Sequence, residues 1–245
     1  MWEASKCNLC GDCLTKCLYV DYNKTKVVAE IRALMSGKEA EILSECITCC
    51  ACREYCPTGA DPHDLILNSQ EKFDIFPSTM KSRMDLALEV PNQIILGDPE
   101  KPILSLCVME KQLPQDALKS KLFEGLGVVK GGDYFCLIGY LHIGRGTSIG
   151  RGAQKFIDKM TSLGKDIIFL HDDCYAMVHT KIKDYGIPVP FRYMHLFEYM
   201  RNYLRDHKNS ISKLGKRIAY QRPCASRYTP EKDILLGGNI HFNWG

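Results

Sequence analysis

The sequence predicts an α+β protein, with a small helical, cysteine-rich N-terminal domain and a C-terminal α/β domain that has a mainly parallel sheet. Nine of the 13 cysteines fall within the first 56 residues. Beyond residue 101, short apolar runs alternate with amphipathic stretches, as strands and helices do in a parallel sheet. The chain of 245 residues is 45% hydrophobic, which is enough to bury an ordinary globular core.

Composition and charge exclude several classes of protein. The formal net charge is only +3, and no basic stretch carries interleaved aromatic residues, so nucleic acid is not an expected partner. The N-terminus lacks a basic and then apolar leader, and the apolar runs are too short for a transmembrane segment. An odd number of cysteines without an export signal favours metal or redox chemistry over disulfides. We expect a cytoplasmic protein, free or peripheral to a membrane complex.

The N-terminal cysteines form two runs with the same spacing. Each run reads C-x2-C-x2-C-x3-C once Cys50 is set aside. This is the ligand run of bacterial ferredoxins that carry two [4Fe–4S] clusters, in which the fourth cysteine of each run binds the other cluster. The predicted ligand sets are Cys7, Cys10, Cys13 and Cys56 for one cluster, and Cys46, Cys49, Cys52 and Cys17 for the other.

Cys50 is the surplus thiol of the second run. We interpret it as a small buried residue packed beside a cluster. Pro57 follows Cys56 as the pattern requires, whereas Leu18 after Cys17 departs from it. A structural zinc site is the alternative, but three cysteines at successive two-residue gaps crowd a single tetrahedral ion.

The first hundred residues predict helices and one connector. Apolar residues over 27–35 follow a helical period that breaks at Ser36-Gly37 and resumes over 38–45. Residues 61–73 predict a helix with Asp61 as its cap. The four prolines of 73–102 favour one helix near 78–89 and then an extended connector. We therefore expect a domain at 1–75, a linker at 76–100 and a second domain at 101–245.

The second domain predicts alternating strands and helices. The loop at 142–152 resembles a phosphate-binding loop but fits neither of the common glycine patterns, so we interpret it as a flexible loop with two arginines. The predicted strands are 102–109, 133–140, 165–174, 189–195 and 215–224, and the predicted helices are 114–127, 150–164, 175–186 and 196–207.

The remaining cysteines lie at or near the carboxyl ends of predicted strands. In a parallel sheet these ends share one rim, where ligands bind. His171 has ligand-like spacing to Cys174, and imidazole can replace thiolate on iron. Ordinary buried cysteines and a hydrogen-bonded strand-end histidine are the alternatives, and we expect Asp172 and Asp173 to face solvent. The candidate extra site comprises Cys107, Cys136, His171, Cys174 and Cys224.

On these motifs the chain resembles the heterodisulfide reductase iron–sulfur proteins over nearly its whole length. In that family an alpha-helical ferredoxin part with two clusters is joined to a cysteine-rich part built from CCG repeats. The helical link between the two runs is typical of this ferredoxin type. A repeat there reads Cys, Cys-Cys and C-x-x-C, which matches Cys107, Phe135-Cys136 and His171 to Cys174 here. The motif "RPCASR" (222–227) resembles the opening of a second repeat whose remainder is absent, so the CCG-like domain is incomplete.

The resemblance implies an iron–sulfur subunit that relays single electrons within an oxidoreductase complex. Its expected partners are flavin- and iron–sulfur-containing subunits of a hetero-oligomer, because the chain has no flavin or nicotinamide motif of its own. One alternative is a catalytic thiol/disulfide reductase with a third iron–sulfur cluster on the C-terminal domain. Another is an assembly factor with structural clusters. The missing second repeat favours the relay.

Overall fold

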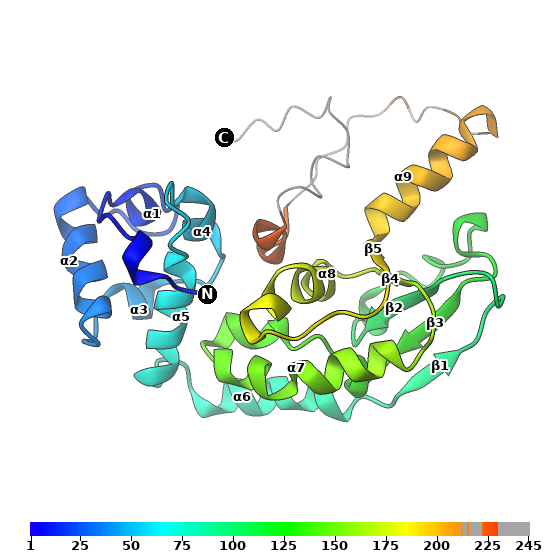
Figure 1. Ribbon diagram of the computed structural model, residues 1–245, viewed down its shortest axis with the longest axis horizontal. Coiled ribbons are helices and arrows are strands. Elements are labelled where there is room, and N and C mark those ends of the chain that lie inside the picture. Colours follow the sequence, from blue (N-terminus) through cyan, green and yellow to red (C-terminus); the bar gives the residue numbers. More distant parts are fainter. Residues whose placement is uncertain (211, 213–214, 216–221, 230–245) are drawn as a thin grey trace.

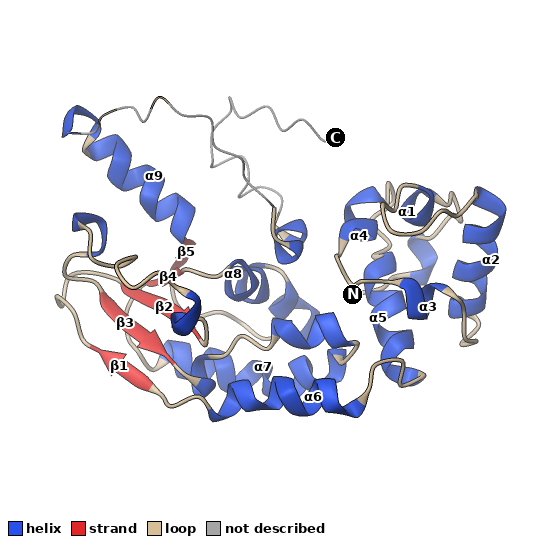
Figure 2. Cartoon of the chain, turned by 180° about the vertical axis from the view of Figure 1, so that it is seen from behind, coloured by secondary structure: helices blue, strands red, loops and turns tan. Residues whose placement is uncertain are grey.

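The fold is that of a computed structural model, which describes residues 1–210, 212, 215 and 222–229 (Figure 1). Helices α1 to α5 form a helical unit at one end of the molecule, and the sheet lies at the other end (Figures 1 and 2). Helix α6 (Ser78–Asp85) runs between them. This is the predicted α+β architecture, with helices first and a mainly parallel sheet after them.

The helical unit follows local signals in the sequence. Helix α2 begins after Asn23, whose side chain accepts a hydrogen bond from the Lys26 N–H at 2.9 Å, and it ends before Gly37, which has a left-handed φ of 70°. The link between the two cysteine runs is therefore helical, as predicted. The helices of this unit are α1 (Asp12–Thr15), α2 (Lys24–Met35), α3 (Ile42–Glu45), α4 (Ala51–Tyr55) and α5 (Pro62–Lys72).

Helix α5 joins the two parts of the molecule. It is capped by Asp61, which accepts a hydrogen bond from the Asp64 N–H, and Pro62 occupies its first position, as predicted. It contacts α2, α3 and α4 of the helical unit and also α7 (Gly146–Thr161) of the α/β unit. Leu67 of α5 and Cys50 consequently pack into the same core as α7.

The sheet has the strand order β1-β3-β2-β4-β5 among the described strands. Strand β1 pairs antiparallel with β3, and the other neighbouring pairs are parallel. Strand β1 lies within the segment predicted as an extended connector, so the sheet takes its edge strand from before residue 101. The strands are β1 (Gln93–Ile95), β2 (Ile103–Cys107), β3 (Gly127–Lys130), β4 (Ile167–Phe169) and β5 (Tyr193–His195).

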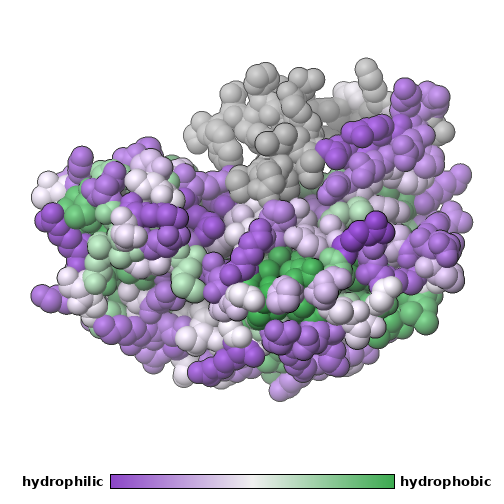
Figure 3. Space-filling model, in the orientation of Figure 1, coloured by the Kyte–Doolittle hydropathy of each residue, from purple (hydrophilic) through white to green (hydrophobic). Residues whose placement is uncertain are grey.

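Successive side chains of β2 and β4 point to opposite faces of the sheet, so they pack into two different cores. Ile103 and Phe169 pack with α7 and α8 (Asp172–His179) on one face. Leu104 and Ile168 pack on the other face against residues 113–126 and α9 (Leu196–Asp206). The surface in Figure 3 is largely hydrophilic, and one of its hydrophobic areas lies at the end that carries β1.

Two predicted elements are wrong. Residues 114–126, all described, form turns and the short 3-10 helix Lys121–Phe123 instead of an α-helix, and Gly127 begins β3. Their apolar side chains cover one sheet face without helical regularity, because Leu118 and Phe123 both pack on that core. Residues 133–140 form parts of two 3-10 helices, Gly132–Tyr134 and Ile138–Ile143, instead of a strand. A short continuous apolar run fits any buried segment, so periodicity alone could not decide.

The expected loop at 142–152 is also wrong in part, because α7 begins at Gly146. Two of its three glycines permit close packing. A Cβ on Gly152 would clash with Leu137, and one on Gly150 would press on the Tyr185 ring. Most of the strand predicted at 215–224 lies outside the described residues.

Candidate metal centres

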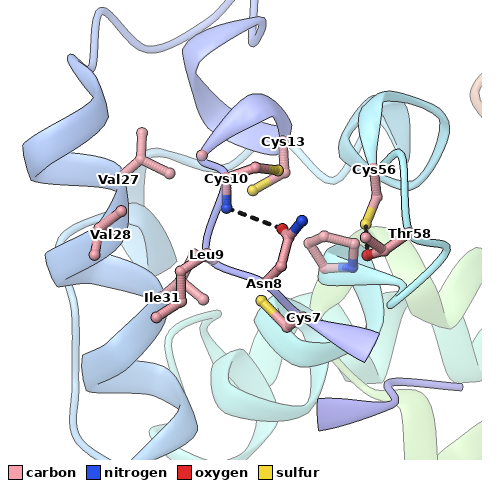
Figure 4. A pocket seen from close by; sticks show the side chains of 12 residues that line it. Cys7, Asn8, Leu9, Cys10, Cys13, Val27, Val28, Ile31, Cys56 and Thr58 are labelled. Carbon is pink, nitrogen blue, oxygen red and sulfur yellow. Dashed lines mark hydrogen bonds between the residues drawn. The ribbon is translucent and has the colours of Figure 1, made fainter. Parts of the chain in front are cut away.

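The first cavity is lined by Cys7, Cys10, Cys13 and Cys56, together with apolar residues of α2. Figure 4 shows their sulfur atoms around a common space. Leu9 and Gly11 have φ values of 57° and 88°, which bend the loop between the first thiols and start α1. Cys56 arrives from the opposite direction, directly after α4. The fourth thiol of this cavity therefore comes from the second run.

Burial and mutual repulsion oppose ionisation of these thiols. Burial raises the pKa of Cys13 to about 12, and the charges of Cys56, Cys10 and Cys7 add to the effect. Burial also opposes ionisation of Cys56, but hydrogen bonds with the Thr58 hydroxyl (3.4 Å) and the Ala60 N–H (3.3 Å) lower its pKa overall. The positive charge of a bound metal would offset this repulsion and so stabilise the thiolates.

The second cavity is lined by Cys17 of the first run and by Cys46, Cys49 and Cys52 of the second. Two left-handed residues, Thr48 (φ 60°) and Cys50 (φ 65°), fold the 46–52 loop around it. Burial raises the pKa of Cys46 to about 11, although the Thr48 N–H donates to its sulfur at 3.3 Å. Each cavity thus gathers one of the four-cysteine sets that the spacing predicts.

Cys50 lines this second cavity and is almost fully buried. Its sulfur lies 3.6 Å from His63 Nε2, and His63 Nδ1 lies 2.9 Å from the Tyr228 hydroxyl. Burial lowers the pKa of His63 to about 4, so this imidazole is neutral at neutral pH. The surplus thiol is therefore held in a buried polar chain, and its neighbour His63 is one that sequence spacing could not reveal.

A third group lies in the α/β unit. The ligand atoms of Cys107, Cys136, His171 and Cys174 all lie within 4.8 Å of one another. Cys107 ends β2, His171 precedes α8, and Cys174 lies in the first turn of α8. Cys136 lies between two 3-10 helices and not at a strand end, so it joins the group from a different direction than predicted.

The topology of the sheet explains why Cys107 and His171 lie close together. The chain runs from β2 to β3 on one side and then crosses to β4 on the other side of β2. In such sheets ligands bind beyond the carboxyl ends of the strands where the order reverses. Cys107 is the last residue of β2 and His171 lies shortly after β4, so both flank this position.

The separation within the third group fits a single ion. A tetrahedral ion with metal–sulfur bonds of about 2.3 Å holds its ligand atoms about 3.8 Å apart. Three thiols and one imidazole within 4.8 Å come close to that geometry, and Cys3His is a common zinc set. The group could hold a metal ion or a cluster, and its compactness suits the ion better.

The thiols of the third group differ in how readily they ionise. Hydrogen bonds from the Cys136 and Cys174 thiols hold the pKa of Cys107 well below its usual range. Burial raises the pKa values of Cys136 and Cys174, and the charge on Cys107 adds to this. Metal binding at this group must therefore release protons from the two protonated thiols.

Asp172 and Asp173 do not face solvent, so that expectation was wrong. The side chains of Asp172 and Asp173 are only 13% and 15% exposed. Asp173 Oδ2 lies 3.7 Å from His171 Nε2, which is within ion-pair distance of the imidazole of the third group. Asp172 Oδ1 lies 3.2 Å from His195 Nε2.

Cys224 does not join the third group. It begins the 3-10 helix Cys224–Tyr228, and burial raises its pKa, with a further contribution from the charge of Cys49. Arg227 of the same helix donates to the Cys49 carbonyl at 2.5 Å. Cys224 is therefore a neighbour of the second cavity.

The second cavity also touches the α/β unit. The Thr48 hydroxyl lies 3.1 Å from His142 Nδ1. This contact joins residues 94 positions apart, so no pattern in the sequence reveals it.

No family model, curated protein or solved structure matches this chain. Among the described residues, no helix combines the length and the apolar character needed to cross a bilayer. The chemistry of the three thiol groups is therefore the main indication of what this protein does.

Proposed function

We propose that this chain is an iron–sulfur electron-transfer subunit of a heterodisulfide reductase-like complex in the cytoplasm. One observation carries the proposal: each N-terminal cavity brings three cysteines of a predicted ligand set from one run together with the fourth from the other run, and Cys50 is an additional thiol of the second cavity. This crossed arrangement is that of ferredoxins with two [4Fe–4S] clusters. Cys7, Cys10, Cys13 and Cys56 would hold one cluster, and Cys46, Cys49, Cys52 and Cys17 the other.

The chain's own groups set the conditions for electron transfer. Each cluster would supply a centre that accepts or gives up one electron. Main-chain donors reach the ligand sulfurs, as in the Ala60 N–H bond to Cys56 and the Thr48 N–H bond to Cys46. Such hydrogen bonds stabilise the reduced, more negative state and so raise the reduction potential. The apolar lining from α2 limits access of water to the first centre.

The loop around the second centre contacts the α/β unit. Thr48 of this loop lies 3.1 Å from His142 Nδ1. We propose that flavin- and iron–sulfur-containing partner subunits supply or remove electrons at the helical unit, within a hetero-oligomer.

The alternative is a catalytic thiol/disulfide reductase that uses a third cluster at Cys107, Cys136, His171 and Cys174. A catalytic metal site keeps an open position for its substrate. Here four donors already surround one point, which favours a closed metal site and the relay function.

Anaerobic iron and sulfide analysis with EPR tests the proposal. We expect about eight irons and eight sulfides per chain from two [4Fe–4S] clusters, and one further metal in the third group. The matched pair Cys49→Ser and Cys50→Ser separates a ligand from its neighbour: the first should remove about half of the iron and the second none. Zinc in place of iron, or equal losses in both variants, would overturn the proposal.

A further inference from the structure

A cavity of about 540 Å³ opens beside Cys107, at the carboxyl ends of β2 and β3. Its size lies within the range typical of pockets for small molecules. The proposed electron relay does not use it, and its lining differs from that of the thiol cavities. Three groups matter for what it can bind: the lysines Lys111 and Lys130, the carboxylate of Glu110, and the apolar side chains of Val90 and Val108.

The walls of this cavity are fixed by hydrogen bonds of the main chain. The Gly132 N–H donates to the Val90 carbonyl, and the Gly131 N–H donates to the Cys107 carbonyl, both at 2.8 Å. Asn92 exchanges two 3.0 Å hydrogen bonds with Asp133. The 90–93 segment, which forms one wall, is therefore tied to the loop after β3, so this wall is preformed.

The charges on the lining favour an anion. Glu110 forms an ion pair with Lys130, and Lys111 adds a second cation to the same lining. Asp133, behind the wall, is already paired with Lys155 at 2.7 Å and Lys159 at 2.9 Å. The lining residues therefore carry one more positive than negative charge.

We propose that this cavity binds a small organic acid, with its carboxylate at Lys111 and Lys130 and its carbon chain against Val90 and Val108. The bound acid would lie next to Cys107 and hence at the edge of the third thiol group. The inference goes beyond the proposed relay and does not depend on which metal that group holds.

Hexanoate is a suitable probe, with hexanol as its uncharged counterpart, on the full metal-loaded chain under anaerobic conditions. Isothermal titration calorimetry should detect hexanoate and not hexanol. Lys111→Met should weaken hexanoate binding by about tenfold, because one close charge contact is lost. Glu110→Gln should instead tighten binding several-fold, because it frees Lys130 from its partner. Lys119→Met, at an exposed lysine paired with Asp116 elsewhere, is the control and should leave the affinity unchanged.

Opposite shifts in the Lys111 and Glu110 variants would support the proposal, since a general loss of structure would move both affinities the same way. No hexanoate binding to the parent chain would overturn it. So would equal affinities in the parent and Lys111→Met, or binding of inorganic phosphate in place of hexanoate.

Discussion

Replacing Lys181 by methionine removes the buried cation that joins the α/β unit to the helical unit. Lys181 Nζ lies 2.8 and 2.9 Å from the two carboxylate oxygens of Asp64 in α5, and 2.8 Å from Asp184 Oδ2. The side chains of Lys181 and Asp64 are only 5% and 4% exposed. Removing one partner of a buried ion pair typically costs about 3–5 kcal/mol, because the other charge stays buried without compensation.

We expect about 3 kcal/mol here, because the N-terminal ammonium, 3.3 Å from Asp64 Oδ2, retains part of the compensation. At roughly 2–4 °C per kcal/mol for a chain of this size, the midpoint of thermal unfolding should fall by about 6–12 °C. Unfolding of the metal-loaded chain by urea and by heat, at constant metal content, measures this change.

The stability difference between the parent and Lys181→Met should depend on pH, and the direction follows from the pKa of Asp64. Burial opposes ionisation of Asp64, but Lys181 lowers its pKa overall below the ordinary value of 3.8. The ion pair therefore stabilises the parent at neutral pH, and this contribution is lost as the pH falls through the lowered pKa. In Lys181→Met the pKa of Asp64 should instead be raised, so the variant's deficit should shrink in acid, where Asp64 takes up a proton.

The double variant Asp64→Asn/Lys181→Met is the control, because it leaves no charge unpaired at this pair. It should recover part of the lost stability relative to Lys181→Met. A single variant within 1 kcal/mol of the parent at pH 7, or a deficit that grows as the pH falls, would refute the reasoning.

Three further predictions concern the centres and the packing. If the fourth ligands are crossed, Cys13→Ser/Cys56→Ser should lose no more iron than either single variant, whereas Cys13→Ser/Cys52→Ser should lose both clusters; equal losses from the two double variants would contradict the pairing. Cys174→Ser should remove the metal of the third group while the EPR signals of the N-terminal clusters persist, and metal analysis with EPR checks both. Gly132→Ala should destabilise the chain by about 1–3 kcal/mol in urea unfolding, since a Cβ there would clash with the main-chain carbonyl of Leu88; an unchanged midpoint would show that this contact relaxes.

The sequence predicted the features that depend on local spacing. The cysteine runs, the helical link, the start of α5 and the parallel sheet all have short-range signals, such as Asp61 and Pro62 at the head of α5. The features that it missed depend on tertiary contacts. Strand β1 is short and exposed, so only its pairing with β3 identifies it as part of the sheet.

The third group was partly predictable from the sequence and partly not. Topology could predict that Cys107, His171 and Cys174 lie close together, because Cys107 ends β2 and the other two follow β4, its parallel neighbour. Cys136 reaches the group from a segment predicted as a strand, where Leu137 has a left-handed φ of 67° that apolar periodicity does not signal. The Thr48–His142 contact joins two units whose mutual orientation depends on the whole interface.

The crossed arrangement of the cysteines has a consequence for biosynthesis. Neither cavity is complete with the thiols of one run, because the first requires Cys56 and the second requires Cys17. During translation, the first run must remain open until the second run has left the ribosome, a delay on the order of seconds at ordinary elongation rates. If the proposed clusters are bound there, their delivery should follow the synthesis of the whole helical unit, and the nascent chain, with its thiols exposed, should be most vulnerable to oxygen at that stage.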